Sequence, residues 1–167
     1  MARVGIALGS NLGDKTSSLA AARDALSQLS IEGSEILQAP IYRTAPVDCP
    51  ADSPDFYNTV IEMSFEGSPQ QLIQQTQPLE KQLGRTDKTV HNEARIIDLD
   101  LLYFDDVNLH TELLELPHPR LTQRRFVLQP LADIRPDLIL PNQTQSVAQL
   151  LTLLDTDEPA LELVQAT

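Results

Sequence analysis

The chain has 167 residues, of which 24 are Asp or Glu and 12 are Lys or Arg, and its net charge is −12 at pH 7. This length allows one domain with a sizeable core, the composition is that of an ordinary globular protein, and the negative charge argues against binding to nucleic acid. No apolar run approaches the roughly 20 residues that span a bilayer, no signal peptide is evident, and the single Cys49 cannot form an internal disulfide. We therefore expect a cytoplasmic protein that binds neither membrane nor nucleic acid.

The N-terminal part of the chain predicts a strand followed by a helix. Residues 3–9 are apolar enough for a central strand, and Asp14 can cap a helix whose apolar positions 19, 22, 26 and 29 recur at helical spacing. The turn at 9–13 resembles a phosphate-binding loop only loosely, because it has no Lys and no full glycine fingerprint. A plain strand-to-helix connection is the better interpretation of that turn.

Two more strands are expected next, at 35–43 and 56–65, separated by a loop that carries three prolines in residues 45–55. On the later strand, Phe56, Asn58 and Val60 share one face. An aromatic ring beside a side-chain amide can hold a flat heterocycle by stacking and hydrogen bonding. An edge-of-sheet Phe with a turn-capping Asn explains the same residues at least as well.

A second helix is predicted to begin at Ser68, with Pro69 in its first turn and Gly84 as its stop. Pro78 is expected to kink or break it. A polar loop over residues 85–94 then leads into the most informative stretch of the chain.

That stretch, residues 95–104, is a predicted strand with two carboxylates on one face. Alternation places Ile97, Leu99, Leu101 and Tyr103 on one side, and Ile96, Asp98, Asp100, Leu102 and Phe104 on the other. Neighbouring like charges repel, and burying them is costly unless a positive group compensates. A metal ion is one candidate, and a solvated face paired with Lys or Arg is the alternative. Eight of the 12 Lys and Arg and all three His lie between residues 81 and 135, which suits a protein that handles a small anion with a divalent metal.

The element order strand, helix, strand, strand, helix, strand predicts an α+β fold with a ferredoxin-like βαββαβ core and an antiparallel sheet. An extra hairpin is expected at 107–110 and 113–116, and C-terminal helices at 126–134 and 146–154, giving α/β/α layers. We expect a single domain over residues 1–167, with a core at about 3–154 and a frayed acidic tail at 155–167.

Seven short motifs occur along the chain in a characteristic order. They are Leu8-Gly9-Ser10-Asn11-Leu12-Gly13, Tyr42-Arg43-Thr44, Phe56-Tyr57-Asn58, Leu79-Glu80 with Gly84-Arg85, Arg95-Ile96-Ile97-Asp98-Leu99-Asp100, Pro117-His118-Pro119-Arg120 and Arg124-Arg125-Phe126-Val127-Leu128. From about residue 4 to residue 140 the chain resembles the 6-hydroxymethyl-7,8-dihydropterin pyrophosphokinases of folate biosynthesis.

The resemblance implies a monomeric, ATP-dependent diphosphokinase. It would transfer a pyrophosphoryl group from ATP to the hydroxymethyl oxygen of 6-hydroxymethyl-7,8-dihydropterin and release AMP, using two Mg2+ ions. Both metal ions would be held by Asp98 and Asp100, and Arg85 and Arg95 would join these aspartates in the catalytic set. By position, the pterin site comprises Thr44, Ala45, Val47, Phe56, Asn58 and Phe126. The ATP site comprises Glu80, Arg85, Arg95, Ile97, His118 and Arg124.

Two alternatives stay open at this point. The segment His91-Asn92-Glu93-Ala94-Arg95 stands where many family members carry Arg-Trp-Gly-Pro-Arg, so a non-catalytic module that only binds nucleotide or pterin is one alternative. A metal-dependent phosphatase that uses the same aspartates is the other.

Overall fold

The computed structural model describes residues 1–44, 55–83, 97–155 and 160–165 as an α+β structure. The strands of its main sheet are β1 (Ala2–Ser10), β2 (Leu37–Gln38), β3 (Ile41–Thr44), β4 (Phe56–Phe65), β5 (Asp98–Phe104) and β8 (Glu162–Gln165). A separate hairpin is made of β6 (Leu109–His110) and β7 (Glu115–Leu116). The helices are α1 (Lys15–Ser27), α2 (Pro69–Gln82), the one-turn η1 (Leu121–Gln123), α3 (Arg125–Ile134) and α4 (Val147–Leu153).

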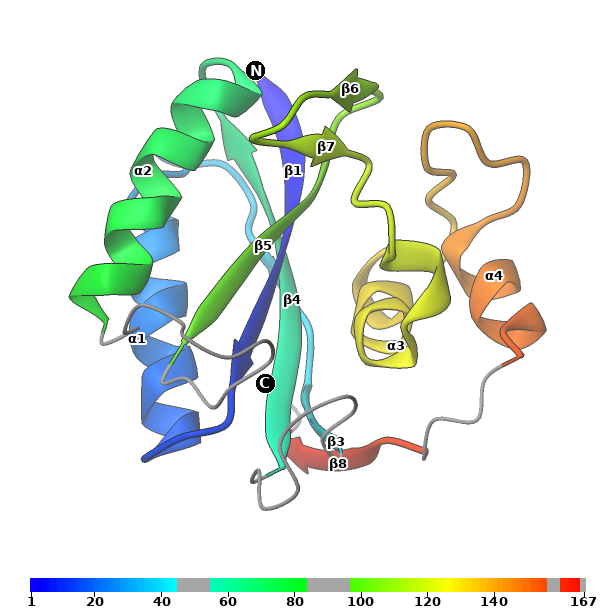
Figure 1. The fold of residues 1–167 in the computed structure, drawn as a ribbon, viewed down its shortest axis with the longest axis horizontal. Coiled ribbons are helices and arrows are strands. Elements are labelled where there is room, and N and C mark those ends of the chain that lie inside the picture. Colours follow the sequence, from blue (N-terminus) through cyan, green and yellow to red (C-terminus); the bar gives the residue numbers. More distant parts are fainter. Residues whose placement is uncertain (45–54, 84–96, 156–159, 166–167) are drawn as a thin grey trace.

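The main sheet is antiparallel at every described pairing and has the strand order β5-β1-β4-β3-β8, with β2 also paired to β4. Helices α1 and α2 lie on one side of this sheet, and α3 and α4 lie on the other (Figure 1). Each side has its own buried apolar cluster. The predicted α+β class and antiparallel sheet are therefore confirmed, and the helices lie in two layers.

Helices α1 and α2 both begin where the sequence predicts. The Asp14 side chain accepts a hydrogen bond from the Ser17 amide, and Ser68 forms a reciprocal capping box with Gln71. We expected a kink or a break at Pro78, and helix α2 continues through this proline to Gln82, so the helix does not break there. No described helix is long and apolar enough to cross a membrane.

Strand β5 departs from simple alternation at Leu102. Gly5 and Ile6 of β1 are neighbours, yet their partners on β5 are Tyr103 and Leu101, so Leu102 is an extra residue in the ladder. A bulge of this kind shifts the following side chains to opposite faces. Tyr103 consequently packs with Leu102 on the α3 side and Phe104 packs on the α1 side, which reverses the predicted faces of both residues.

Three other expectations need correction. The predicted strand at 35–43 is divided into β2 and β3, because Pro40 has no amide hydrogen for a ladder bond. Both strands of the predicted hairpin are shorter, with two residues each. The tail expected to fray instead provides β8, which pairs with β3 at the edge of the sheet.

Candidate functional site

A line of four residues crosses the sheet on the face that α3 covers. Gly9 of β1 is paired with Asp98 of β5 on one side and with Asn58 of β4 on the other, and Asn58 is paired with Tyr42 of β3. We call Asp98, Gly9, Asn58 and Tyr42 the Gly9 row. Residues paired across strands present their side chains to the same face, and strands are about 4.8 Å apart. The predicted metal ligand and the predicted pterin-reading amide are thus separated by one strand, or roughly 10 Å of backbone.

Gly9 leaves the middle of this row without a side chain. A Cβ atom built at Gly9 would lie 3.2 Å from Asn58 Oδ1, the only atom of the described residues within 4 Å of it apart from its chain neighbours. A glycine here therefore keeps bulk out of the space between Asp98 and Asn58. The sequence alone does not predict this position of Gly9 between Asp98 and Asn58, because it depends on the cross-strand register.

The two strand aspartates share one face, as predicted. Asp98 is paired with Gly9 and Asp100 with Ala7, and both carboxylates are half-buried. Between them, the Leu99 amide donates a 2.8 Å hydrogen bond to Glu80 Oε1 of helix α2. β5 is the last of the described strands at this end of the sheet, and the buried bond to Glu80 gives the Leu99 amide an acceptor where no described strand supplies one. Glu80, predicted to lie in the ATP site, thus also holds the backbone of the aspartate strand.

The amide end of the site is ordered by Thr44. The Asn58 side chain is 5% exposed, and its Nδ2 donates a 3.1 Å hydrogen bond to Thr44 Oγ1. This bond fixes the amide orientation and leaves Asn58 Oδ1 beside Gly9. Phe56 is paired with Thr44 and lies on the same face, half-buried. The sheet therefore brings together the three described residues that were predicted to bind pterin from β3 and β4.

The remaining described site residues come from α3 and the segment before it. The Arg124 guanidinium lies 5.5 Å from the centroid of the Phe126 ring, so a predicted nucleotide contact and a predicted pterin contact are adjacent. The His118 amide donates to Leu102 O at 2.8 Å, and its Nδ1 accepts the Arg120 amide at 3.2 Å. With Nδ1 acting as an acceptor, neutral His118 carries its proton on Nε2 and can donate it to a ligand.

Electrostatics links His118 to both sides of the site. Burial first, and then the positive charges of Arg124 and Arg120, lower the pKa of His118 below its ordinary value, while Glu115 and Asp98 act in the opposite direction. His118 is consequently neutral at pH 7. Because Arg124 and Asp98 both act on the pKa of His118, the start of α3 and the Asp98 end of the Gly9 row both lie near this histidine.

Some predicted residues are not brought into the site. The Ile97 side chain is fully buried in the cluster beneath α1 and α2, so it faces away from the aspartates, and only its backbone can contact a nucleotide. Ala45, Val47, Arg85 and Arg95 lie outside the described residues.

Asp98 and Asp100 are not part of a larger cluster of metal-binding side chains among the described residues. Within the described residues, no group of three or more His, Cys, Asp and Glu could hold a metal. Two carboxylates on one face still suit Mg2+, a hard cation that proteins usually bind through one or two carboxylates together with substrate phosphates.

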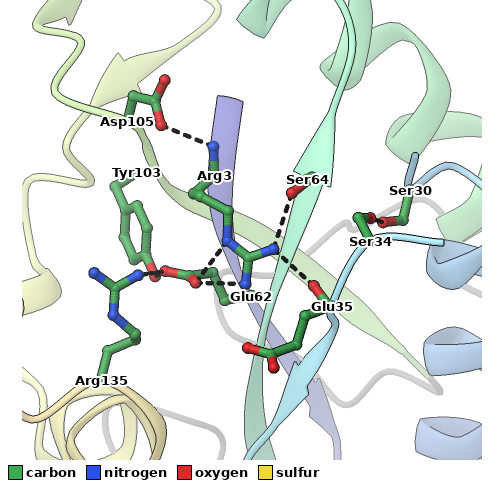
Figure 2. A network of polar contacts seen from close by, with 9 residues as sticks. All are labelled: Arg3, Ser30, Ser34, Glu35, Glu62, Ser64, Tyr103, Asp105 and Arg135. Atoms are coloured by element: carbon green, nitrogen blue, oxygen red, sulfur yellow. Dashed lines mark hydrogen bonds and ion pairs between the residues drawn. The ribbon is translucent and has the colours of Figure 1, made fainter. Parts of the chain in front are cut away.

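A second polar cluster on the same face was missed in the sequence. Glu62 is 1% exposed, and Arg3 reaches its Oε2 with Nε at 2.9 Å and Nη2 at 2.7 Å (Figure 2). The Tyr103 hydroxyl donates to its Oε1 at 2.5 Å, and Arg135 at the end of α3 contacts the same oxygen. Glu62 pairs with Gly5, which also pairs with Tyr103, and we call Tyr103, Gly5 and Glu62 the Gly5 row. A lone Glu between Ile61 and Met63 was the signal in the sequence.

The α+β fold thus places two carboxylates, Asp98 and Asp100, on the same face of an antiparallel sheet as the aromatic ring of Phe56 and the amide of Asn58. These groups define a class of protein that can bind a flat heterocycle and a metal-bound phosphate. Comparison with known proteins makes the assignment specific. Residues 5–136 match the model of the 7,8-dihydro-6-hydroxymethylpterin-pyrophosphokinase (HPPK) family. The chain belongs to this family, which confirms the resemblance predicted from its motifs.

Individual relatives agree with the family match. The chain is 37% identical over 145 residues to a 2-amino-4-hydroxy-6-hydroxymethyldihydropteridine pyrophosphokinase of Haemophilus influenzae, covering 87% of this chain and 88% of that one. It is 38% identical over 144 residues to the folic acid synthesis protein fol1 of Pneumocystis carinii, covering 86% of this chain and only 19% of that protein. The chain thus spans about a fifth of the length of the fol1 relatives.

A solved structure supports the fold alone. Wild-type HPPK-DHPS of Plasmodium falciparum with pteroate superposes with a TM-score of 0.67 at 14% sequence identity. The match covers 90% of this chain and 42% of that one.

Proposed function

We propose that this protein transfers a pyrophosphoryl group from ATP to the hydroxymethyl oxygen of 6-hydroxymethyl-7,8-dihydropterin, forming the pterin diphosphate and AMP. The observation that carries the proposal is the Gly9 row. It aligns Asp98 with Asn58 on one face of the sheet, with the glycine Gly9 between them. A pterin held at Asn58 and a nucleotide phosphate held at Asp98 would meet above Gly9.

At the pterin end, the chain binds and orients. Phe56 on the sheet and Phe126 on α3 supply aromatic surface for the bicycle. Asn58 Oδ1 would accept a hydrogen bond from a ring N–H, because Asn58 Nδ2 already donates to Thr44 Oγ1. Binding both substrates in one geometry converts a bimolecular encounter into an intramolecular step.

At the phosphate end, the chain neutralises charge. Asp98 and Asp100 would hold two Mg2+ ions, whose positive charge would offset the negative charge of the triphosphate. Arg124 adds a fixed positive charge, and neutral His118 can donate Nε2–H to a nucleotide oxygen. The nucleophile is the substrate hydroxyl, so no side chain needs to form a covalent bond.

We extend the proposal to the form in which the protein works. Its core is ferredoxin-like, because the elements follow the βαββαβ order: β1, α1, the divided strand β2 and β3, β4, α2 and β5. Residues 1–167 act as one domain and as a monomer in the cytoplasm, in keeping with a single cysteine and a net charge of −12.

The decisive experiment incubates the purified chain with Mg2+, ATP and the hydroxymethyl pterin and separates the nucleotides. We expect AMP and pterin diphosphate in equal amounts. Tight pterin binding without any product would instead identify a binding module. Release of inorganic phosphate in the absence of pterin would identify a phosphatase.

A further inference from the structure

Helix α3 is tied to the sheet by two polar contacts at its C-terminal end. The Tyr42 hydroxyl of β3 donates to Asp133 Oδ2, and Arg135 contacts Glu62 Oε1 of β4. Its other end, where Arg124 and Phe126 lie, has no side-chain hydrogen bond capping the helix. The placement of Phe126 over the sheet therefore depends on apolar packing and on the two distant ties.

The two ties reach different parts of the sheet. Tyr42 is the cross-strand partner of Asn58 and lies two residues before Thr44, the residue that orients the Asn58 amide. Glu62 is four residues further along β4 than Asn58 and belongs to the Gly5 row. Only the tie between Tyr42 and Asp133 joins α3 to the row that carries the proposed pterin site.

The helix geometry connects Asp133 to Phe126. They are seven residues apart, or nearly two helical turns, so they share a face and are separated by roughly 10 Å along the axis. Phe126 and Asp133 therefore lie on one edge of α3, beside its buried face, and Tyr42 of β3 contacts this edge at Asp133. A shift of α3 at Asp133 would change the gap between Phe126 and the sheet.

The tie has the character of a strong hydrogen bond. A phenol that donates to a carboxylate forms a charge-assisted bond, which is shorter and stronger than a neutral one. Gln129 Nε2 lies 3.4 Å from the second carboxylate oxygen, Oδ1 of Asp133. Burial first, and then Asp133, raise the pKa of Tyr42 to about 12, so its hydroxyl keeps its proton at neutral pH.

We propose that Tyr42 and Asp133 are positioning residues for the pterin, which set the spacing between Phe126 on α3 and the Gly9 row on the sheet. This inference rests on the proposed function, because the spacing matters only if a flat ring is held there. A ring stacked on Phe126 needs contacts of about 3.5–4.0 Å on each face, so a small displacement of the helix weakens its binding. Nucleotide binding should be less sensitive to the tie, because Asp98 and Asp100 lie on β5 and only Arg124 of the proposed nucleotide contacts lies at the start of α3.

The test compares Tyr42→Phe, Asp133→Asn and the double variant by calorimetry with the hydroxymethyl pterin and, separately, with Mg2+ and a non-hydrolysable ATP analogue. Each single change should raise the pterin Kd about 3- to 10-fold, since Tyr42→Phe removes the donor and Asp133→Asn replaces the charged acceptor by a weaker neutral one. The double variant should be no worse than the weaker-binding single variant, because both changes act on the same contact. The Kd of the ATP analogue should change less than 2-fold in all three.

Matched controls remove the same chemical groups elsewhere. Tyr57→Phe removes a phenol from the residue next to Asn58 on the opposite face of β4, and Asp137→Asn removes an exposed carboxylate just after α3. Both should leave the pterin Kd unchanged. Unfolding in urea is measured for every variant, so that a general loss of stability is separated from a specific loss of pterin affinity.

The outcomes distinguish this inference from the function it rests on. Unchanged pterin affinity in Tyr42→Phe and Asp133→Asn, with wild-type protein that binds pterin and releases AMP, overturns the positioning role alone. Additive effects in the double variant overturn the shared contact. Wild-type protein that binds no pterin overturns the proposed function itself.

Discussion

The Gly5 row and the Gly9 row both cross β5, β1 and β4 on the same face of the sheet, four residues or roughly 13 Å apart along β1, and the Gly9 row continues to β3. Each has a glycine of β1 flanked by polar side chains from β5 and β4. In the Gly5 row the space above the glycine is filled, because a Cβ atom there would lie 2.3 Å from the Tyr103 ring. In the Gly9 row the one described neighbour of such an atom is Asn58 Oδ1, at 3.2 Å.

The difference separates a structural use of polar residues from a ligand-binding use. In the Gly5 row the buried Glu62 has two guanidinium groups and a phenol as partners, so the protein itself satisfies its charge. The bulge at Leu102 makes this possible, since it turns Tyr103 toward Gly5. In the Gly9 row no comparable ring covers the glycine among the described residues. We propose that substrates occupy the corresponding space.

The largest expected effect comes from the charged end of the Gly9 row. Asp98→Asn and Asp100→Asn keep the size of the side chain and remove a negative charge that would hold Mg2+. We expect kcat/KM for AMP formation to fall by about 10³-fold or more, equivalent to about 4 kcal/mol of transition-state stabilisation. Asp106→Asn, an exposed change in the turn after β5, is the matched control. Full activity in either aspartate variant would falsify the metal assignment.

The corresponding change in the Gly5 row should affect stability and spare the chemistry. Glu62→Gln leaves Arg3 and Arg135 facing a neutral amide. We expect a loss of about 2–3 kcal/mol in the free energy of unfolding, below the usual range for breaking a buried pair, because the two Arg side chains are 28% and 33% exposed. Urea denaturation measures the loss, and kcat at a temperature where the variant is folded should stay within about 3-fold of wild type. A catalytic loss as large as that of the aspartates would remove the distinction between the rows.

The two rows also differ in how far the sequence predicts them. Asp98, Asp100, Phe56 and Asn58 were assigned correctly to one face of their strands, because side chains alternate along a regular strand. The order of the motifs predicts the family from the sequence alone. What the sequence could not supply was the pairing between strands, so neither Gly9 as the centre of the site nor Tyr42 as a partner of Asn58 was foreseen.

Local irregularities account for the wrong expectations. The bulge at Leu102 reversed the faces of Tyr103 and Phe104, and a single extra residue in a ladder leaves no mark in an alternating apolar sequence. The sequence does not predict the C-terminal strand β8, because Glu162, Leu163 and Val164 have exposed side chains and show no clear period. It is a strand because β3 offers it an open edge, which is a property of the folded sheet.

A direct comparison of the glycines comes next in size. Gly5→Ala places a methyl group against the Tyr103 ring, and overpacking of this kind should cost about 2 kcal/mol of stability. Among the described residues the added methyl group of Gly9→Ala meets the end of the Asn58 side chain and nothing else, so the free energy of unfolding should stay within about 0.5 kcal/mol of wild type. Its kcat/KM for the pterin should nevertheless fall by about 10-fold, because the methyl group enters the space between the substrates. Urea denaturation and AMP release are measured on both variants, and the comparison fails if Gly9→Ala is fully active.

The smallest expected effect is a pH dependence that belongs to the Gly9 side of the sheet. Burial, Arg124 and Arg120 lower the pKa of His118 in the folded protein, whereas the unfolded chain takes up a proton near the ordinary value of 6.5. Neutral His118 therefore contributes to the free energy of unfolding above pH 6.5, and this contribution should be lost as the pH falls toward the lowered pKa. His118→Gln should remove this part of the acid sensitivity, so that its urea midpoint falls less between pH 7 and pH 5.5 than that of wild type. His110→Gln, at the exposed hairpin, is the matched control, and equal slopes for wild type and His118→Gln would contradict the assignment.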